Sequence, residues 1–173
     1  MKAVTLNKYG KPDALQLVDI EMPIPKEDEV LIKIDAIPVT TEDPLQRMGR
    51  PYFTRLFFGF TKPKNPILGA EFSGEIVSTG KHVSQFETGD KVFGHSGKGL
   101  GCYAEYVCVQ EKGLLLKRPK KIKDEELAPV CTFMAAWNFM VSLAEVKPNQ
   151  KVLINGASGT VGTAAVQIAK LFS

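Results

Sequence analysis

The first two thirds of the chain alternate short apolar runs with turn residues, a pattern typical of β-structure. The runs are rich in valine, isoleucine and aromatic residues, and each is bounded by glycine, proline, aspartate or asparagine. The run that begins at Val30 ends in alternating apolar and charged residues, as in a strand with one solvent-facing side. Many short strands separated by turns favour a β-barrel. The predicted strands cover residues 1–6, 15–19, 30–36, 72–78, 91–93 and 104–109.

The pattern becomes helical near residue 120. Asp124 is an N-cap candidate followed by two carboxylates, which the helix dipole favours at a helix start. Pro129 separates this turn from a second predicted helix over residues 131–145, and a third is predicted over 160–172. Between them, residues 151–154 are apolar enough to predict a parallel strand buried on both faces. The expected buried side of the last helix consists of Val161, Ala164, Ala165, Ile168 and Leu171.

Residues 151–162 predict a strand, a glycine-rich turn and a helix, which is the context that a dinucleotide-binding fingerprint requires. Gly156 would permit the turn, Gly159 would let the backbone approach a pyrophosphate, and Gly162 would let the helix pack closely. Free N–H groups at the helix start would face the phosphates. A purely structural glycine turn in another α/β protein is the alternative. The predicted cofactor-binding residues are Gly156, Ala157, Ser158, Gly159, Thr160, Val161 and Gly162.

Composition and charge narrow the function classes. A Walker A loop is excluded because Thr163, and not lysine, follows Gly162. The net charge of +3 is too small to indicate nucleic acid, and the basic stretch 117–123 lacks aromatic residues for stacking bases. The three cysteines form no CxxC pair, which favours a reducing compartment. The apolar stretch 131–146 is too short to span a bilayer. We therefore expect a cytoplasmic protein with neither nucleic acid nor membrane as a partner.

Five sequence blocks, taken in order, resemble the medium-chain dehydrogenase/reductase family, and the last has the form typical of its zinc-free, quinone oxidoreductase-like branch. The resemblance implies a GroES-like β-barrel catalytic domain over residues 1–120. It also implies linker helices and the incomplete beginning of an NAD(P)-binding Rossmann domain over residues 121–173, with the active cleft between the two domains. Family members continue for roughly as many residues again. The blocks are residues 36–43, 66–80, 83–94, 101–106 and 157–162.

The resemblance also implies that no catalytic zinc is present. Zinc-dependent relatives carry a cysteine and a histidine where this chain has Thr40 and Ala70, so only Cys131 falls at a ligand position. One thiol is too few, because a catalytic zinc needs about three such ligands. Of the residues between 94 and 103, where a four-cysteine structural lobe would lie, only Cys102 is a cysteine. Both histidines, at positions 82 and 95, are expected in surface loops.

Zinc-free relatives reduce quinones or α,β-unsaturated carbonyl compounds with NADPH, so the resemblance implies a metal-independent NAD(P)H-dependent reductase. Such a reaction needs only hydrogen-bond donors for the developing oxyanion. Thr40 stands where relatives often carry asparagine, and Thr40, Thr41 and Tyr52 are the candidate catalytic donors. The residue that reads the ribose would lie beyond Ser173. The cofactor is therefore NADP or NAD, and the resemblance favours NADP.

Two further features leave alternatives open. Residues 50–66 gather five aromatic side chains among cations, which predicts a wall for a flat substrate, rings that fill the barrel's flank, or contact with a membrane surface. A single strand–helix unit would expose apolar surface and unpaired backbone groups, so we expect a homo-oligomer. The same incompleteness suggests that this length of chain is inactive alone. The alternative to a reductase is a non-catalytic GroES-like fragment or binding module.

Overall fold

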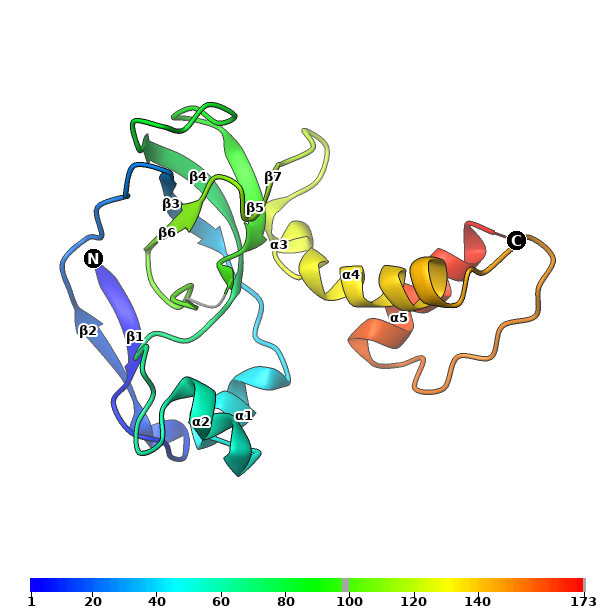
Figure 1. Cartoon of the computed structure of the whole chain (residues 1–173), viewed down its shortest axis with the longest axis horizontal. Helices are drawn as coiled ribbons and strands as arrows, with labels where there is room; N and C mark the ends of the chain where they lie inside the picture. The colour runs from blue at the N-terminus through cyan, green and yellow to red at the C-terminus, as the bar shows by residue number, and fades with distance from the viewer. Residues whose placement is uncertain (98–99, 173) are drawn as a thin grey trace. The chain divides into compact units, whose positions relative to one another are not determined.

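The computed structural model describes residues 1–97 and 100–172, with only the backbone of Cys131 and Thr132. These residues form two compact units, Met1–Ala128 and Pro129–Ser173 (Figure 1). Each unit has its own cluster of buried apolar side chains.

A five-stranded antiparallel sheet, ordered β6-β3-β4-β5-β7, organises the N-terminal unit. The long strand β3 lies between β4 and β6, and its register with β4 shifts twice. Such irregularities increase local twist and help a sheet to curl. The strands are β3 (Glu29–Ala36), β4 (Glu71–Thr79), β5 (Lys91–His95), β6 (Tyr106–Gln110) and β7 (Leu114–Lys117).

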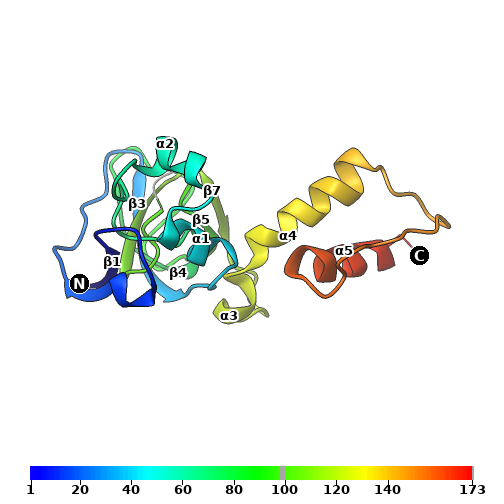
Figure 2. The same ribbon diagram turned by 90° about the horizontal axis from the view of Figure 1, so that it is seen from below.

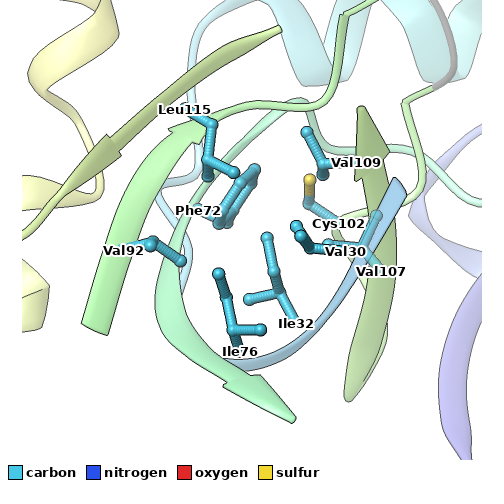
Figure 3. Packing of buried hydrophobic residues seen from close by; sticks show 9 residues of the cluster. All are labelled: Val30, Ile32, Phe72, Ile76, Val92, Cys102, Val107, Val109 and Leu115. Atoms are coloured by element: carbon cyan, nitrogen blue, oxygen red, sulfur yellow. The ribbon is translucent and has the colours of Figure 1, made fainter. Parts of the chain in front are cut away.

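The sheet curls around an apolar core that strands far apart in sequence build together (Figure 3). Val30 and Ile32 point inward from alternate positions of β3, as the period of a strand requires. Phe72 is fully buried, and burying a side chain of this size contributes about 2–3 kcal/mol. The core residues are Val30, Ile32, Phe72, Ile76, Val92, Cys102, Val107, Val109 and Leu115.

A separate antiparallel hairpin, β1 (Lys2–Leu6) and β2 (Leu15–Asp19), opens the chain. Isolated bridges from Ala3 to Ala104 and from Thr5 to Ile67 tie β1 to the segments that flank the main sheet. Both strands match the sequence prediction, whereas β7 was not predicted.

Two short helices, α1 (Glu42–Met48) and α2 (Arg55–Phe58), lie in the connection between β3 and β4 (Figures 1 and 2). The sequence pattern did not predict them. Gly49 ends α1 in a left-handed conformation at φ 60°, which glycine adopts without a steric penalty. The Arg47 side chain donates to the carbonyl of Gly10, so α1 is attached to the loop that follows β1.

A polar network fixes the last turn of the N-terminal unit, helix α3 (Asp124–Leu127), to β4. The hydroxyl of fully buried Ser73 donates to one oxygen of Asp124, and Arg118 donates to the other at 2.9 Å. Arg118 and Asp124, two of the charged residues near position 120, are therefore part of the packed structure. They hold the helix onto the sheet.

The C-terminal unit pairs helix α4 (Val130–Trp137), continued by a π-helical turn at Asn138–Leu143, with helix α5 (Thr160–Lys170). These elements confirm the two predicted helices apart from their ends. Buried residues from both helices form its core: Ala136, Met140, Ala164, Ala165 and Ile168. Val161 and Leu171 were expected to be buried, but they are 38% and 74% exposed, because α4 covers only one side of α5.

The prediction of a strand at residues 151–154 is wrong: these residues form no strand. A strand exists only where a neighbour pairs with its backbone N–H and C=O groups, and the described residues of this unit offer no such neighbour. Leu153 is consequently 95% exposed.

We predict that Asp124→Ala destabilises the N-terminal unit by about 2 kcal/mol, because it leaves the Ser73 hydroxyl and the Arg118 guanidinium without their acceptor. Urea denaturation followed by circular dichroism measures this loss. Glu125→Ala, on the same helix turn and exposed, is the matched control and should change stability little. Equal stability of the two variants would contradict the role of the network.

Candidate functional site

The predicted site residue Thr40 is held by the carboxylate of Asp43. The backbone N–H of Thr40 donates to Asp43 Oδ2 at 2.6 Å, and its hydroxyl donates to the same oxygen at 2.9 Å. In return, the backbone N–H of Asp43 donates to the Thr40 carbonyl at 3.3 Å. Asp43 therefore fixes the loop that enters α1 and directs the hydroxyl proton of Thr40 towards itself.

The next residue, Thr41, is exposed and stands at the N-cap of α1 without a side-chain capping bond. Within the described part of the chain, no hydrogen bond occupies its hydroxyl group. Thr41 is thus the threonine whose hydroxyl is available to a ligand, while Thr40 is already engaged.

Two residues that the sequence analysis did not select lie beside this loop. Burial raises the pKa of the Tyr103 phenol, and the neighbouring Asp43 carboxylate raises it further. Burial lowers the pKa of His95, and Glu42 opposes this effect. At neutral pH both side chains are therefore uncharged. The only sequence signal for Tyr103 was its place in the block 101–106.

The expectation that His95 lies in a surface loop is wrong. His95 is the last residue of β5 and is partly buried, and its Nδ1 accepts a hydrogen bond from the backbone of Gly97 at 2.8 Å. His82 does lie in an exposed loop, where it faces Glu27 and Asp28.

Tyr52, the third predicted site residue, belongs to a different group of side chains. It lies in a short 3₁₀ turn and is 64% exposed. Its ring is 5.5 Å from the Arg50 guanidinium and 5.0 Å from that of Arg55, and Arg50 donates to its phenol oxygen at 3.4 Å. Among the described residues, no hydrogen bond joins Tyr52 to Thr40 or Thr41.

Two hollows accompany these groups. One lies beneath α2, between Tyr9, Phe57, Phe58 and Leu68, and the buried Gln46 Oε1 beside it has no hydrogen-bond partner among the described residues. The other is a shallow, mainly apolar groove that reaches Tyr103 and Val39, next to Thr40. Its apolar lining includes Leu15, Leu17, Ile34 and Ile37.

The predicted cofactor residues form a solvent-accessible turn at the start of α5. Gly156 has φ +77°, and its carbonyl accepts from the Gly159 N–H at 3.1 Å. Gly162 packs on this turn so closely that a Cβ there would lie 2.2 Å from the Gly156 oxygen. Gly159 is the N-cap of α5 and brings no side chain to cap it, so the first helical N–H groups remain open to an anion.

The described residues contain no group of three or more histidine, cysteine, aspartate or glutamate side chains that could hold a metal ion. The side chain of Cys131 lies outside the described atoms, as do residues 98 and 99 in the stretch where a structural zinc lobe was considered. The expectation of a zinc-free site remains a prediction.

Residues 26–120, more than half of the chain, match the family described as the alcohol dehydrogenase GroES-like domain. The chain belongs to this family. It is 34% identical to the human protein named quinone oxidoreductase over 178 residues, which covers 99% of this chain and 50% of the human protein. It is also 36% identical to a spinach protein named quinone-oxidoreductase homolog, chloroplastic, covering 99% of this chain and 53% of that protein.

Solved structures give the same result. The quinone oxidoreductase from Coxiella burnetii superimposes with a TM-score of 0.85 at 32% identity, covering 99% of this chain and 54% of that one. Escherichia coli quinone oxidoreductase complexed with NADPH gives a TM-score of 0.85 at 26% identity, covering 99% of this chain and 50% of that one. The chain is thus a member of the medium-chain dehydrogenase/reductases of the quinone oxidoreductase type, and it spans about half the length of the relatives it matches.

The fold class expected from the sequence, a GroES-like barrel with the beginning of a nucleotide-binding domain, is confirmed by these matches. Within the described part of the chain, no helix combines the length and the apolar character that crossing a bilayer requires.

We predict that Gly162→Ala loosens the turn at the start of α5, because its Cβ must displace the Gly156 carbonyl at a cost of about 1–3 kcal/mol. Hydrogen exchange of the Ala164, Ala165 and Ile168 amides should become faster. Gly159→Ala is the matched control: its Cβ would lie 3.5 Å from the nearest atom, an ordinary contact, and its φ is −77°. Unchanged exchange in Gly162→Ala would show that the close packing of this glycine is not needed.

Proposed function

We propose that the chain is the substrate-side domain and first nucleotide-binding segment of an NAD(P)H-dependent reductase that acts on quinones or α,β-unsaturated carbonyl compounds without a metal. The observation that carries the proposal is the uncapped, glycine-lined start of α5 in a chain of this family. Several of its relatives are named quinone oxidoreductases, which supports the substrate class.

The turn at residues 156–162 fits the diphosphate of a nicotinamide cofactor. Its backbone N–H groups are accessible, its N-cap is a glycine, and the Ser158 hydroxyl lies in the same exposed turn. The bound cofactor would supply a hydride. We favour NADP over NAD, since a solved relative was crystallised with NADPH. Because residues 151–154 have no partner strand, we also propose that turnover needs the rest of a nucleotide-binding sheet.

The two threonines have different roles in this proposal. Thr41 donates its hydroxyl hydrogen bond to the oxygen that becomes negative when hydride reaches the substrate. Thr40, whose hydroxyl is directed at Asp43, holds the loop in place, and Tyr103 and His95 beside it stay uncharged at neutral pH. Tyr52, which stacks with Arg50 and Arg55, is the candidate for a second donor through its phenol. The apolar groove at Val39 and Tyr103 suits a flat hydrophobic substrate.

We propose the cytoplasm as the location, since Cys102 and Cys108 are free thiols, although two relatives carry chloroplastic and mitochondrial in their names.

We also propose a homo-oligomer. Leu143 and Leu153 are 68% and 95% exposed, and such side chains favour association.

We predict that the chain binds NADPH weakly, as measured by the change in nicotinamide fluorescence on titration. Gly159→Ala should weaken this binding at least about tenfold, because it places a methyl group where the backbone meets the diphosphate. A quinone added afterwards should not be reduced at a measurable rate. A folded chain with no NADPH binding would instead favour the non-catalytic binding module.

We predict that Thr41→Val lowers kcat/KM for benzoquinone about 100-fold, since removing one oxyanion donor has an effect of this order. The assay uses a chimera in which this chain is continued by the C-terminal half of the E. coli enzyme. Thr41→Ser should restore activity, whereas Thr61→Val, at an exposed position outside the site, should have no effect. Full activity of Thr41→Val would rule out its hydroxyl as a donor.

A further inference from the structure

The connection that carries α1 and α2 has an excess of positive charge. Apart from Glu42 and Asp43 at the start of α1, it contains no aspartate or glutamate, although the chain as a whole is close to neutral. Within the described part of the chain, none of the cations in this connection forms an ion pair, whereas lysines elsewhere, such as Lys91 and Lys117, do. The cations are Arg47, Arg50, Arg55, Lys62 and Lys64.

Large apolar side chains are exposed on the same segment. Phe53, Leu56 and Phe60 are 66%, 69% and 74% exposed, and none of them lines the hollow beneath α2. We call these three residues, together with the exposed cations Arg50, Lys62 and Lys64, the aromatic–basic patch. Exposed apolar side chains close in sequence to unpaired cations indicate an interaction site.

The segment that carries the patch is fixed to the rest of the unit. The guanidinium of Arg55 lies 4.5 Å from the ring of Tyr9 and donates to the carbonyls of Gly49 at 3.0 Å and Met48 at 3.1 Å. The Tyr9 phenol donates to the carbonyl of Gly59 at 2.6 Å. These bonds use backbone carbonyls and rings, so they fix the segment without neutralising its charge.

We propose that the aromatic–basic patch docks on the surface of an anionic lipid bilayer. Phe53, Leu56 and Phe60 enter the interfacial region, where apolar side chains are buried among headgroups and acyl chains. Arg50, Lys62 and Lys64 meet the anionic headgroups. The proposal selects the membrane-surface alternative that the sequence left open for residues 50–66, against the general expectation of no membrane partner.

Charge and side-chain type together distinguish a bilayer from other occupants. A second copy in a two-fold contact would place the same unpaired cations opposite one another, which is unfavourable. A single-stranded nucleic acid is bound by successive aromatic rings in a basic groove, whereas Leu56 has no ring on which a base can stack. The proposal does not depend on the reductase function, because lipid binding is measured without a substrate.

The test is flotation of the chain with vesicles of phosphatidylcholine alone and of phosphatidylcholine mixed with phosphatidylglycerol. We expect binding to the mixed vesicles at least about tenfold stronger than to the neutral ones, and its loss at high salt. The paired variant Phe53→Ser with Phe60→Ser, and the paired variant Lys62→Ala with Lys64→Ala, should each weaken binding about tenfold or more. Circular dichroism confirms that each variant is folded.

Matched controls make the same kinds of substitution outside the aromatic–basic patch. Leu116→Ser changes a leucine of β7 that is 60% exposed, and Lys120→Ala with Lys121→Ala removes two exposed cations outside the patch. Both controls should bind as the parent chain does. Failure to bind mixed vesicles, equal binding to neutral vesicles, or equal losses in the controls would each overturn the proposal. So would a dimer that dissociates in the phenylalanine variant without lipid binding, or tighter binding to single-stranded RNA than to the vesicles.

Discussion

Backbone pairing between strands is the constraint on which the structure depends. In the N-terminal unit, every strand of the main sheet has a neighbour in the described chain, and the curled sheet closes around Phe72 and the other core residues. In the C-terminal unit, residues 151–154 have the composition of a buried strand but no neighbour, so their backbone forms no ladder and Leu153 faces solvent. One unit therefore has a paired sheet, and the other supplies only a turn and two packed helices.

The site residues show how side chains far apart in sequence define one another's chemistry. Asp43 accepts two hydrogen bonds from Thr40, and it also raises the pKa of Tyr103, sixty residues away along the chain. This leaves Thr41 with the available hydroxyl in the loop. A motif comparison selects Thr40 because of its position, while the hydrogen bonds favour its neighbour as the donor.

The connection between β3 and β4 has two faces with different properties. Phe57 and Phe58 line the hollow beneath α2 with Tyr9, although Phe57 is 70% and Phe58 44% exposed. Phe53, Leu56 and Phe60 remain exposed beside unpaired cations. Lining the hollow beneath α2, and not burial, separates Phe57 and Phe58 from the other exposed apolar side chains of this segment.

The sequence by itself determined most of the strands, the approximate helices and the glycine turn, because these follow from local periodicity and from residues such as Gly156 whose backbone conformation is special. It also carried the family resemblance, through five short blocks in order. Only the tertiary structure decided that α1 and α2 form in a stretch without clear periodicity, and that Asp124 bridges Ser73 and Arg118. It also decided that His95 is partly buried and that residues 151–154 form no strand. Each of these outcomes depends on a partner distant in sequence, or on the absence of one, and a local pattern contains no information about such partners.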